Sequence, residues 1–288
     1  MRRTVTPEEA RGRMEVSVDQ GTRGILHPDR QASTYSLTRY PPSAAAGAFV
    51  KHYWVVQWEL QGSETYDSVV LSHPNLNLVF ERERAMVYGI PQKTAVQRLQ
   101  GRDWVIGVKF RAGGFYPFWG KPMSELAGRA VDFRQVFKLD RMPLTEALFA
   151  EEDGQRAAKL VDSFLSERLP ERDSNVDTAD GIVRLIQEDR TIRTSEDAAR
   201  LAGMSLRTMQ RLFARYVGVS PKWVIQRYRL HEAAERAVRE GVHDWTAFAL
   251  ELGYYDQPHF IRAFKSFIGL TPEEYIRKNG RGQHGREA

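Results

Sequence analysis

Short apolar runs separated by Gly, Pro and Asn fill residues 35–119, and their spacing is that of β-strands. Apolar and polar side chains alternate within several of these runs, which places every second residue on the same face of a strand. The pattern predicts strands at Phe49–Glu59, Tyr66–Leu71, Leu76–Glu81, Ala85–Tyr88 and Trp104–Arg111. Several short strands at this spacing are typical of a β-sandwich or β-barrel.

Two of the predicted strands carry apolar side chains at every second position. The sets are Trp54, Val56 and Trp58 on one strand, and Trp104, Ile106, Val108 and Phe110 on the other. We expect both sets to face the interior, with Lys109 and Arg111 pointing the other way.

Beyond Trp119 the apolar spacing changes to that of helices. Met123–Ala127 is predicted as a short helix, and Asp153 as the cap of a longer one that reaches about Leu169. One face of the longer helix carries the apolar side chains Ala157, Leu160, Val161, Phe164 and Leu165. A stripe of this width has to be buried, either on the β segment or against a second subunit. Both alternatives stay open at this point.

The helical pattern from residue 194 to residue 276 occurs twice. The first copy contains Ala199, Gly203, Arg211, Phe213, Gly218 and Pro221, and the second contains Ala249, Gly253, Arg262, Phe264, Gly269 and Pro272. The spacings Ala-x3-Gly and Arg-x-Phe-x4-Gly-x2-Pro are the same in both. A period near 50 residues that occurs only twice indicates a duplicated module.

Each copy has the local signals of a helix-turn-helix. In the first, Thr194 is placed to cap one helix, Gly203 suits the turn that follows, and Ser205 caps a second helix reaching about Tyr216. In the second copy, Asp244 and Asp256 stand at the two helix starts. Between the copies, a helix is expected from Pro221 to about Glu240, since Pro is favoured at a first helical position.

This segment resembles the DNA-binding domain of the AraC/XylS family of transcription regulators over about 100 of the 288 residues. The resemblance implies two helix-turn-helix units joined by a long helix, with recognition helices that enter successive major grooves about 34 Å apart. It also implies double-stranded promoter or operator DNA as the partner, and contact with RNA polymerase. In members that dimerise, helices placed like the one capped by Asp153 form the interface, which implies a homodimer as one alternative.

Polar side chains on the two recognition helices are the candidates for contacts with DNA. They are Ser205, Arg207, Gln210 and Arg211 in the first unit, and Gln257, His259 and Arg262 in the second. Arg can form paired hydrogen bonds with guanine and Gln with adenine, while a helix N-terminus such as that at Ser205 can bind phosphate. The alternative for each is an ordinary solvated surface. Arg211 and its counterpart Arg262 could instead serve phosphates or a structural ion pair.

The all-β segment resembles, more loosely, the cupin-like N-terminal sensing domain that many family members carry. That resemblance implies a small-molecule effector, for which the candidate lining is Trp54, Trp58, His73, Asn77, Trp104 and Phe110. The alternative is that these aromatic residues are ordinary core.

A second function class is a cupin-type enzyme or DNA-repair protein that uses the helix-turn-helix units for targeting. The chain has no cysteine, and His52 and His73 are isolated, without the His-x-His pair of metal-binding cupins. We therefore expect no catalytic residue, no metal and no cofactor, and prefer the regulator. A tightly held transition metal would favour the enzyme.

The charge distribution supports a DNA-binding C-terminal part. Residues 181–288 hold 18 Lys and Arg against 13 Asp and Glu, whereas residues 1–180 hold 24 of each sign. No apolar run approaches the ~20 residues that span a bilayer, and the N-terminus lacks the apolar core of a secretory signal. With no cysteine, these features predict a soluble cytoplasmic protein.

The predicted fold class is α+β: a cupin-like β-barrel or sandwich with flanking helices, followed by an all-α domain of two helix-turn-helix units. The expected divisions are a loosely ordered arm at 1–33, a sensing domain at 34–170, a linker at 171–177, the DNA-binding domain at 178–279 and a tail at 280–288.

Overall fold

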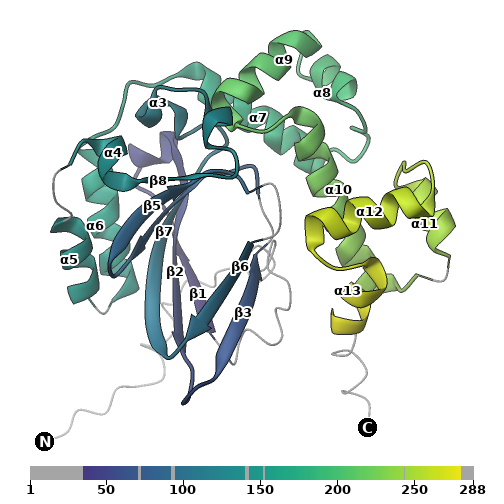
Figure 1. Ribbon diagram of the computed structural model, residues 1–288. Coiled ribbons are helices and arrows are strands. Elements are labelled where there is room, and N and C mark those ends of the chain that lie inside the picture. The colour runs from purple at the N-terminus through teal and green to yellow at the C-terminus, as the bar shows by residue number, and fades with distance from the viewer. Residues whose placement is uncertain are drawn as a thin grey trace, which may run out of the picture.

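The computed structural model describes residues 35–70, 73–91, 95–139, 143–151, 153–242 and 244–279. A sheet-rich N-terminal part is followed by a helical C-terminal part, which confirms the predicted α+β class (Figure 1). The arm predicted at 1–33 and the tail predicted at 280–288 lie outside the described residues. Within the described ranges, no helix is both long enough and apolar enough to cross a membrane.

Most of the described strands form one antiparallel sheet in the order β1-β2-β7-β4-β5-β8, and the remaining two pair as β3-β6. Their bounds are β1 Tyr35–Tyr40, β2 Val50–Glu59, β3 Thr65–Val70, β4 Asn77–Glu81, β5 Arg84–Tyr88, β6 Ala95–Gln100, β7 Arg102–Phe110 and β8 Ala130–Asp132. The five predicted strands match β2, β3, β4, β5 and β7 to within two residues, whereas β1, β6 and β8 were not predicted.

The two apolar sets predicted to share one interior lie on opposite faces of the larger sheet. The register of β2 on β7 places Trp54 opposite Gly107 and Val55 opposite Ile106. Ile106 therefore shares a face with Val55, while Trp54 points to the other side. Both strands are apolar on both faces, and alternation alone could not show which face the helices cover. Lys109 does point away from Ile106, as predicted.

Helices cover the Ile106 face of the sheet, and β3 and β6 lie on the other side (Figure 1). The helices of this region are η2 Ala46–Ala48, α3 Tyr116–Trp119, η3 Met123–Leu126, α4 Phe133–Phe137, α5 Pro143–Ala150 and α6 Gly154–Ser166. Asp153 caps α6 as predicted, and the α6 residues Ala157, Val161 and Leu165 are fully buried. Because α6 packs on β1, β2 and β7, its apolar stripe is buried within the chain. Leu160, predicted as part of the stripe, is 38% exposed. We call β1 to α6 the β domain.

The C-terminal helices follow the predicted order. They are α7 Ser174–Glu188, α8 Ser195–Leu201, α9 Leu206–Leu212, η4 Phe213–Val217, α10 Pro221–Glu240, α11 Trp245–Glu251, α12 Gln257–Ile268 and α13 Pro272–Asn279. η4 is a single π-helical turn that continues α9. The prediction placed the start of α7 at Thr178 or Asp180, but the helix begins at Ser174 because Asp173 caps it.

Two hydrophobic cores divide the chain at the middle of α10. One core runs without a break from the β domain into α7, α8, α9, η4 and α10 as far as Ile225. The other begins at Leu230 and joins the second half of α10 to α11, α12 and α13. The first helix-turn-helix unit (α8, α9 and η4) is therefore packed with the β domain. The second unit (α11 and α12) has a core of its own.

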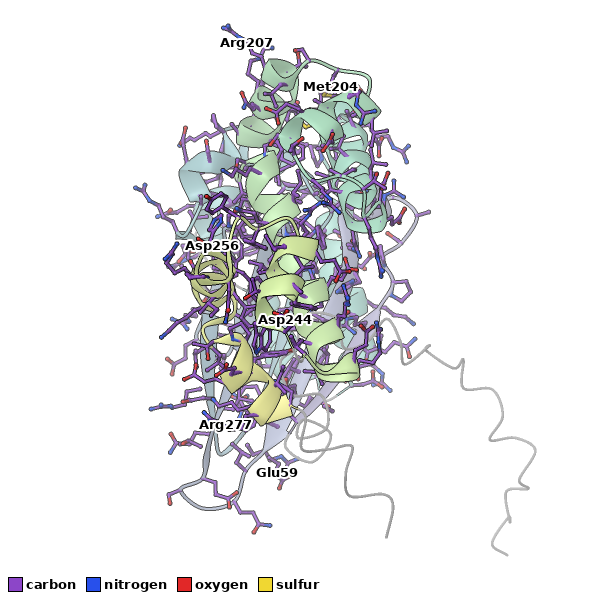
Figure 2. The ribbon with its side chains drawn as sticks, turned by 90° about the vertical axis from the view of Figure 1, so that its right-hand side faces the viewer. Glu59, Met204, Arg207, Asp244, Asp256 and Arg277 are labelled. Atoms are coloured by element: carbon purple, nitrogen blue, oxygen red, sulfur yellow. The ribbon has the colours of Figure 1, made fainter. Side chains whose placement is uncertain are left out.

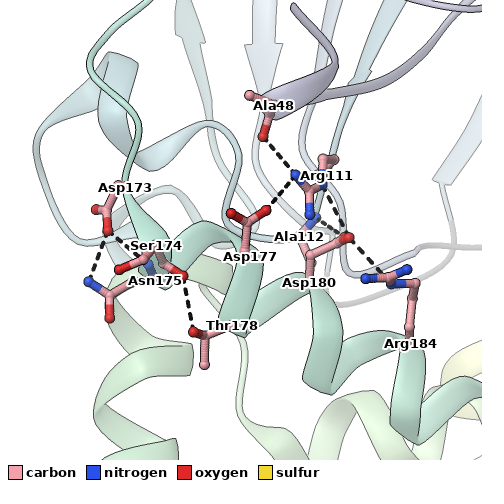
Figure 3. A network of polar contacts seen from close by, with 10 residues as sticks. All are labelled: Ala48, Arg111, Ala112, Asp173, Ser174, Asn175, Asp177, Thr178, Asp180 and Arg184. Atoms are coloured by element: carbon pink, nitrogen blue, oxygen red, sulfur yellow. Dashed lines mark hydrogen bonds and ion pairs between the residues drawn. The ribbon is translucent and has the colours of Figure 1, made fainter. Parts of the chain in front are cut away.

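A buried carboxylate fixes α7 on the β domain. The side chain of Asp180 is 14% exposed and accepts hydrogen bonds from the backbone N–H of Ala112 at 3.1 Å and from Nε of Arg111 at 3.2 Å. Arg111 also donates to the carbonyl oxygen of Ala48 at 2.9 Å and pairs with the exposed Asp177 at 2.8 Å (Figure 3). The residues that follow β7, Arg111 and Ala112, therefore determine where α7 lies.

Two further contacts hold η4, one from the β domain and one from the start of α7. Nε of Arg215 donates to the hydroxyl of Tyr116 at 2.5 Å, and the hydroxyl of Tyr216 donates to Asp173 at 2.5 Å. Burial would raise the pKa of Asp173, but the hydrogen bonds from Tyr216 and Asn175 outweigh burial and hold that pKa below its ordinary value. Together with Arg111, these contacts hold the end of the first recognition helix against the β domain.

Replacing Arg111 by Ala is expected to lower the free energy of unfolding by about 1–3 kcal/mol, because Asp180 loses the hydrogen bond from Arg111 and keeps Arg184, at 3.6 Å, as its charged partner. The matched control is Arg84→Ala, which removes an exposed ion pair with Glu81 and should change the free energy by less than about 1 kcal/mol. Guanidinium unfolding followed by circular dichroism measures both. Equal effects of the two variants would show that Arg111 contributes no more than a surface ion pair.

Gly107→Ala is expected to destabilise the fold by about 1–3 kcal/mol through overpacking, since a Cβ there would lie 2.1 Å from the Trp54 indole. Gly181→Ala should instead stabilise the fold, raising the free energy of unfolding by about 0.5–1 kcal/mol, because Gly181 lies inside α7 with open space around it. Thermal unfolding of both variants checks the pair. A neutral Gly107→Ala would contradict the close packing of Trp54.

Candidate nucleic-acid interface

The first helix-turn-helix unit is built from the residues that the sequence indicated. Thr194 and Asp197 form a reciprocal capping box at the start of α8: the side chain of each residue accepts a hydrogen bond from the backbone N–H of the other residue. Gly203 turns the chain with φ +65°, which favours glycine, and Ser205 caps α9 by accepting the N–H of Thr208. The two helices are thereby fixed at both ends of the turn.

The second unit repeats this geometry with different caps. Asp244 accepts two backbone N–H groups at the start of α11, and Gly253 turns the chain with φ +83°. Asp256 caps α12, where Pro258 occupies the first turn and its missing N–H leaves no gap in the helix ladder. Phe260 and Phe264 of α12 are fully buried, so the opposite side of this helix faces outward.

The candidate side chains of the first unit project from the surface. Ser205, Arg207, Gln210 and Arg211 are all exposed, whereas Met209 and Phe213 on the other side of the helix are fully buried. Figure 2 shows Arg207 at the end of the molecule that the first unit forms. Within the described residues, Arg207 and Arg211 form no ion pair, so both guanidinium groups are available to a ligand.

The candidate side chains of the second unit are less accessible than those of the first. Arg262 and His259 are exposed, and the imidazole of His259 lies edge-on to Tyr254 with 5.3 Å between the ring centres. Gln257 is half-buried, and its Oε1 accepts a hydrogen bond from Thr246 of α11 at 3.1 Å. Contact between the Gln257 amide and a base would therefore compete with an existing hydrogen bond.

Tyr255 was not identified from the sequence, although it is the most exposed of the large apolar side chains in the described residues, at 87%. It stands immediately before Asp256, the cap of α12, while the neighbouring Tyr254 is 8% exposed and packs on Phe260. The Tyr-Tyr pair was a visible signal, but the sequence did not show which ring points outward. An exposed aromatic ring at the start of a recognition helix can stack on a base or donate to a phosphate.

The six candidate effector residues do not line one surface. Trp54 and Asn77 are brought together, since the indole Nε1 donates to Oδ1 of Asn77 at 3.3 Å, and Trp58 lies on the same face of β2. Trp104 and Phe110 lie on the opposite, helix-covered face, where they pack on Phe149 and Phe115. Trp104 and Phe110 therefore do not share a surface with Trp54 and Asn77, contrary to the expectation that all six residues line one pocket.

His73 lies apart from both groups, next to α10. Its imidazole is 6.4 Å from that of His231, measured between ring centres. Both residues border a groove of about 350 Å³ between α7, α10 and α11, whose other charged side chains include the ion pairs Arg190–Glu232 and Arg236–Glu251. Within the described ranges, no three His, Asp or Glu side chains are placed to hold a metal ion.

Known protein families cover both parts of the chain. Residues 38–132 match a family described as a domain of unknown function (DUF6597), and residues 198–278 match a family described as a helix-turn-helix domain. An uncharacterized HTH-type transcriptional regulator of Haemophilus influenzae is 31% identical over 104 residues, which are 36% of this chain. The match covers 34% of that relative's length.

Solved structures similar to this chain include transcription regulators. A transcriptional regulator with an AraC-type DNA-binding domain from Chromobacterium violaceum is 26% identical, with a TM-score of 0.32, over 36% of this chain and 91% of that one. ToxT from Vibrio cholerae O395 is 12% identical, with a TM-score of 0.38, over 85% of this chain and 98% of that one.

The family match and the two turns agree on the same segment. Residues 198–278 contain both turn glycines, Gly203 and Gly253, and both recognition helices, α9 and α12. The chain therefore carries a helix-turn-helix domain made of two units in its C-terminal part, as its sequence indicated.

Proposed function

We propose that this protein is a sequence-specific transcription regulator that binds promoter or operator DNA through both helix-turn-helix units. The observation that carries the proposal is the pair of recognition helices, each of which buries one apolar side and presents polar and cationic side chains to solvent. The excess of positive charge in residues 181–288 adds attraction to the phosphate backbone.

The two units contribute unequally in this proposal. In the first, Arg207, Gln210 and Arg211 are exposed, and Arg207 and Arg211 pair with no described acid, so this unit reads most of the sequence. In the second, Gln257 is engaged by Thr246, which leaves Arg262 and Tyr255 as the more accessible groups. These two side chains fit phosphate and stacking contacts, so the second unit adds affinity more than discrimination.

The β domain acts as the sensing part, and a small-molecule effector changes the availability of the DNA-binding part by binding two states of the protein with different affinity. No catalytic role is assigned to it. Because α6 buries its apolar stripe within the chain, a homodimer would use another surface. RNA polymerase is the second macromolecular partner, and the cytoplasm is the compartment that holds both partners.

Selection of bound sequences from a random pool of double-stranded DNA tests the proposal. We expect enrichment of a site with two boxes about one helical turn apart, since the two recognition helices would enter successive major grooves. A single asymmetric pair of boxes indicates a monomer, and a repeated pair a dimer. Recovery of no enriched sequence by the full-length protein would contradict sequence-specific binding.

Arg207→Ala is expected to weaken binding to the selected site by about 1–3 kcal/mol and to relax preference at one base pair, because it removes a paired contact with a base. The matched control is Arg156→Ala on α6, an exposed Arg of the β domain, for which we expect no change. Fluorescence anisotropy on selected and random DNA measures both. An equal loss on the two DNAs would make Arg207 a phosphate contact instead.

A further inference from the structure

The middle of α10 lies between the two hydrophobic cores, and Arg229 is placed at this point. Ile225 is the last α10 residue of the first core, and Leu230 is the first residue of the second. Figure 1 shows α10 running from the first helix-turn-helix unit to the helices of the second. Because long helices bend, a bend of α10 between Ile225 and Leu230 would move one recognition helix relative to the other.

The guanidinium group of Arg229 contacts the backbone on both sides of this point. Its Nη2 donates a hydrogen bond to the carbonyl oxygen of Ile192, just before the start of α8, and its Nη1 donates to the carbonyl oxygen of Leu252 at 3.5 Å. Ile192 is buried in the first core, and Leu252 is the residue that ends α11. One planar group thus bridges the first unit and the turn of the second.

The environment of the second acceptor favours a cation. Leu252 stands at the C-terminal end of α11, where carbonyl oxygens lack partners within the helix and carry a partial negative charge. The adjacent Gly253 is close to the same guanidinium group, since a Cβ at this glycine would lie 3.7 Å from Nη1 of Arg229. Arg229 therefore packs against the turn of the second unit in addition to its hydrogen bond.

Backbone carbonyls, and not a carboxylate, hold the Arg229 side chain. Within the described residues, the nitrogen atoms of Arg229 form no ion pair. The side chain is half-buried, and burial, followed by the charge of Arg193, lowers the pKa of Arg229, which Glu232 and Asp197 partly offset. The group stays charged at neutral pH, because the ordinary pKa of a guanidinium is far above 7. A partly desolvated cation is favoured only where acceptors surround it, so separating the two units would cost free energy.

Two other contacts cross the same boundary with less directional control. Arg190 at the end of α7 pairs with Glu232 of α10 at 3.0 Å, but Arg190 is largely exposed, and exposed ion pairs contribute little. The rings of Trp223 on α10 and Phe267 on α12 lie 5.7 Å apart, measured between ring centres. Apolar packing is non-directional, so this ring pair resists separation of the units more than their reorientation.

We propose that Arg229 is a positioning residue that keeps α10 from bending at its middle and thereby makes the protein select one spacing between its two DNA boxes. The inference rests on the proposed function, since it concerns how the two units read one site together. Two rigidly joined modules bind both boxes well at only one spacing, whereas a flexible joint accepts several spacings at lower affinity. Arg229 contacts no DNA in this role and acts through the placement of α9 and α12.

Spacing variants of the selected DNA test this role on the full-length protein. Each inserted base pair shifts the second box by about 3.4 Å and turns it by about 35° around the duplex. We expect insertion of two base pairs to weaken binding by the wild-type protein about tenfold or more, and binding by Arg229→Ala less than about threefold. Affinity for DNA that carries the first box alone should be the same in both proteins. An unchanged spacing preference in Arg229→Ala would overturn the proposal.

Two further variants separate the bridge from the charge. Arg229→Lys keeps the charge but replaces the planar fork by one ammonium group, so it should show the relaxed spacing preference of Arg229→Ala. The matched control is Arg190→Ala, which removes a cation and an ion pair at the same boundary and should keep the wild-type preference. Full spacing preference in Arg229→Lys, or its loss in Arg190→Ala, would contradict a bridging role specific to the Arg229 guanidinium.

The distance between the units can also be measured without DNA. The chain has no cysteine, so Glu196→Cys on α8 and Ala247→Cys on α11 introduce one pair of spin labels at exposed positions. Double electron–electron resonance should give one narrow distance distribution in this background. Adding Arg229→Ala should broaden the distribution, and adding Arg190→Ala should not. Equal widths with and without Arg229→Ala would overturn the proposal, whether or not the protein binds DNA.

The two measurements also keep this inference distinguishable from the proposed function. A distribution that broadens in Arg229→Ala, without sequence-specific DNA binding, would retain the bridge and remove the regulator. Specific DNA binding with equal widths and equal spacing preference would leave the regulator standing and remove the bridge. Thermal unfolding of each variant checks folding, and Arg229→Lys, which keeps the charge and most of the aliphatic stem, carries the same comparisons if Arg229→Ala does not fold.

Discussion

The placement of the first helix-turn-helix unit depends on the desolvation of one carboxylate. Asp180 is charged and largely buried, so it is tolerated only where donors surround it, and the N–H of Ala112 with the guanidinium of Arg111 supplies them from the β domain. Once α7 is held in this way, the core of the β domain continues into α8 and α9 without a break. The β domain and the first helix-turn-helix unit therefore share one core, and α7 begins inside the segment 171–177 that the sequence analysis assigned to a linker, because Asp173 caps it.

Local chemistry explains what could be predicted from the sequence. Gly203 and Gly253 end their helices with positive φ, and Ser205, Asp244 and Asp256 cap the helices that follow, because each of these roles depends on neighbours only a few residues away. The exposure of Arg207 and Arg211 could be predicted for the same reason, since Met209 and Phe213 define the buried side of α9.

What could not be predicted depends on partners far along the chain. Ala112 and Asp180 are 68 residues apart, and no local pattern marks them as a pair. Nor could alternation decide between the two faces of β2, since Val55 and Trp54 are both apolar and the choice follows from where α6 packs. Lys109 and Arg39 could not be placed together for a related reason: they come from β7 and β1, and only the register of the strands puts them on one face of the sheet. Two residues of the expected effector lining, Trp104 and Phe110, were misplaced by the same ambiguity.

The spacing between the two helix-turn-helix units is set by α10, because the division between the two cores lies within this helix. α10 belongs to the first core up to Ile225 and to the second core from Leu230, so one continuous helix connects the two helix-turn-helix units. An α-helix rises about 1.5 Å and rotates about 100° for each residue added. One residue inserted into α10 would therefore rotate the second unit by about 100° around the axis of this helix, while the distance between the two units would change by only about 1.5 Å. Substitutions on the surfaces of α9 and α12 would leave the separation of the two units unchanged, because that separation follows from the length of α10.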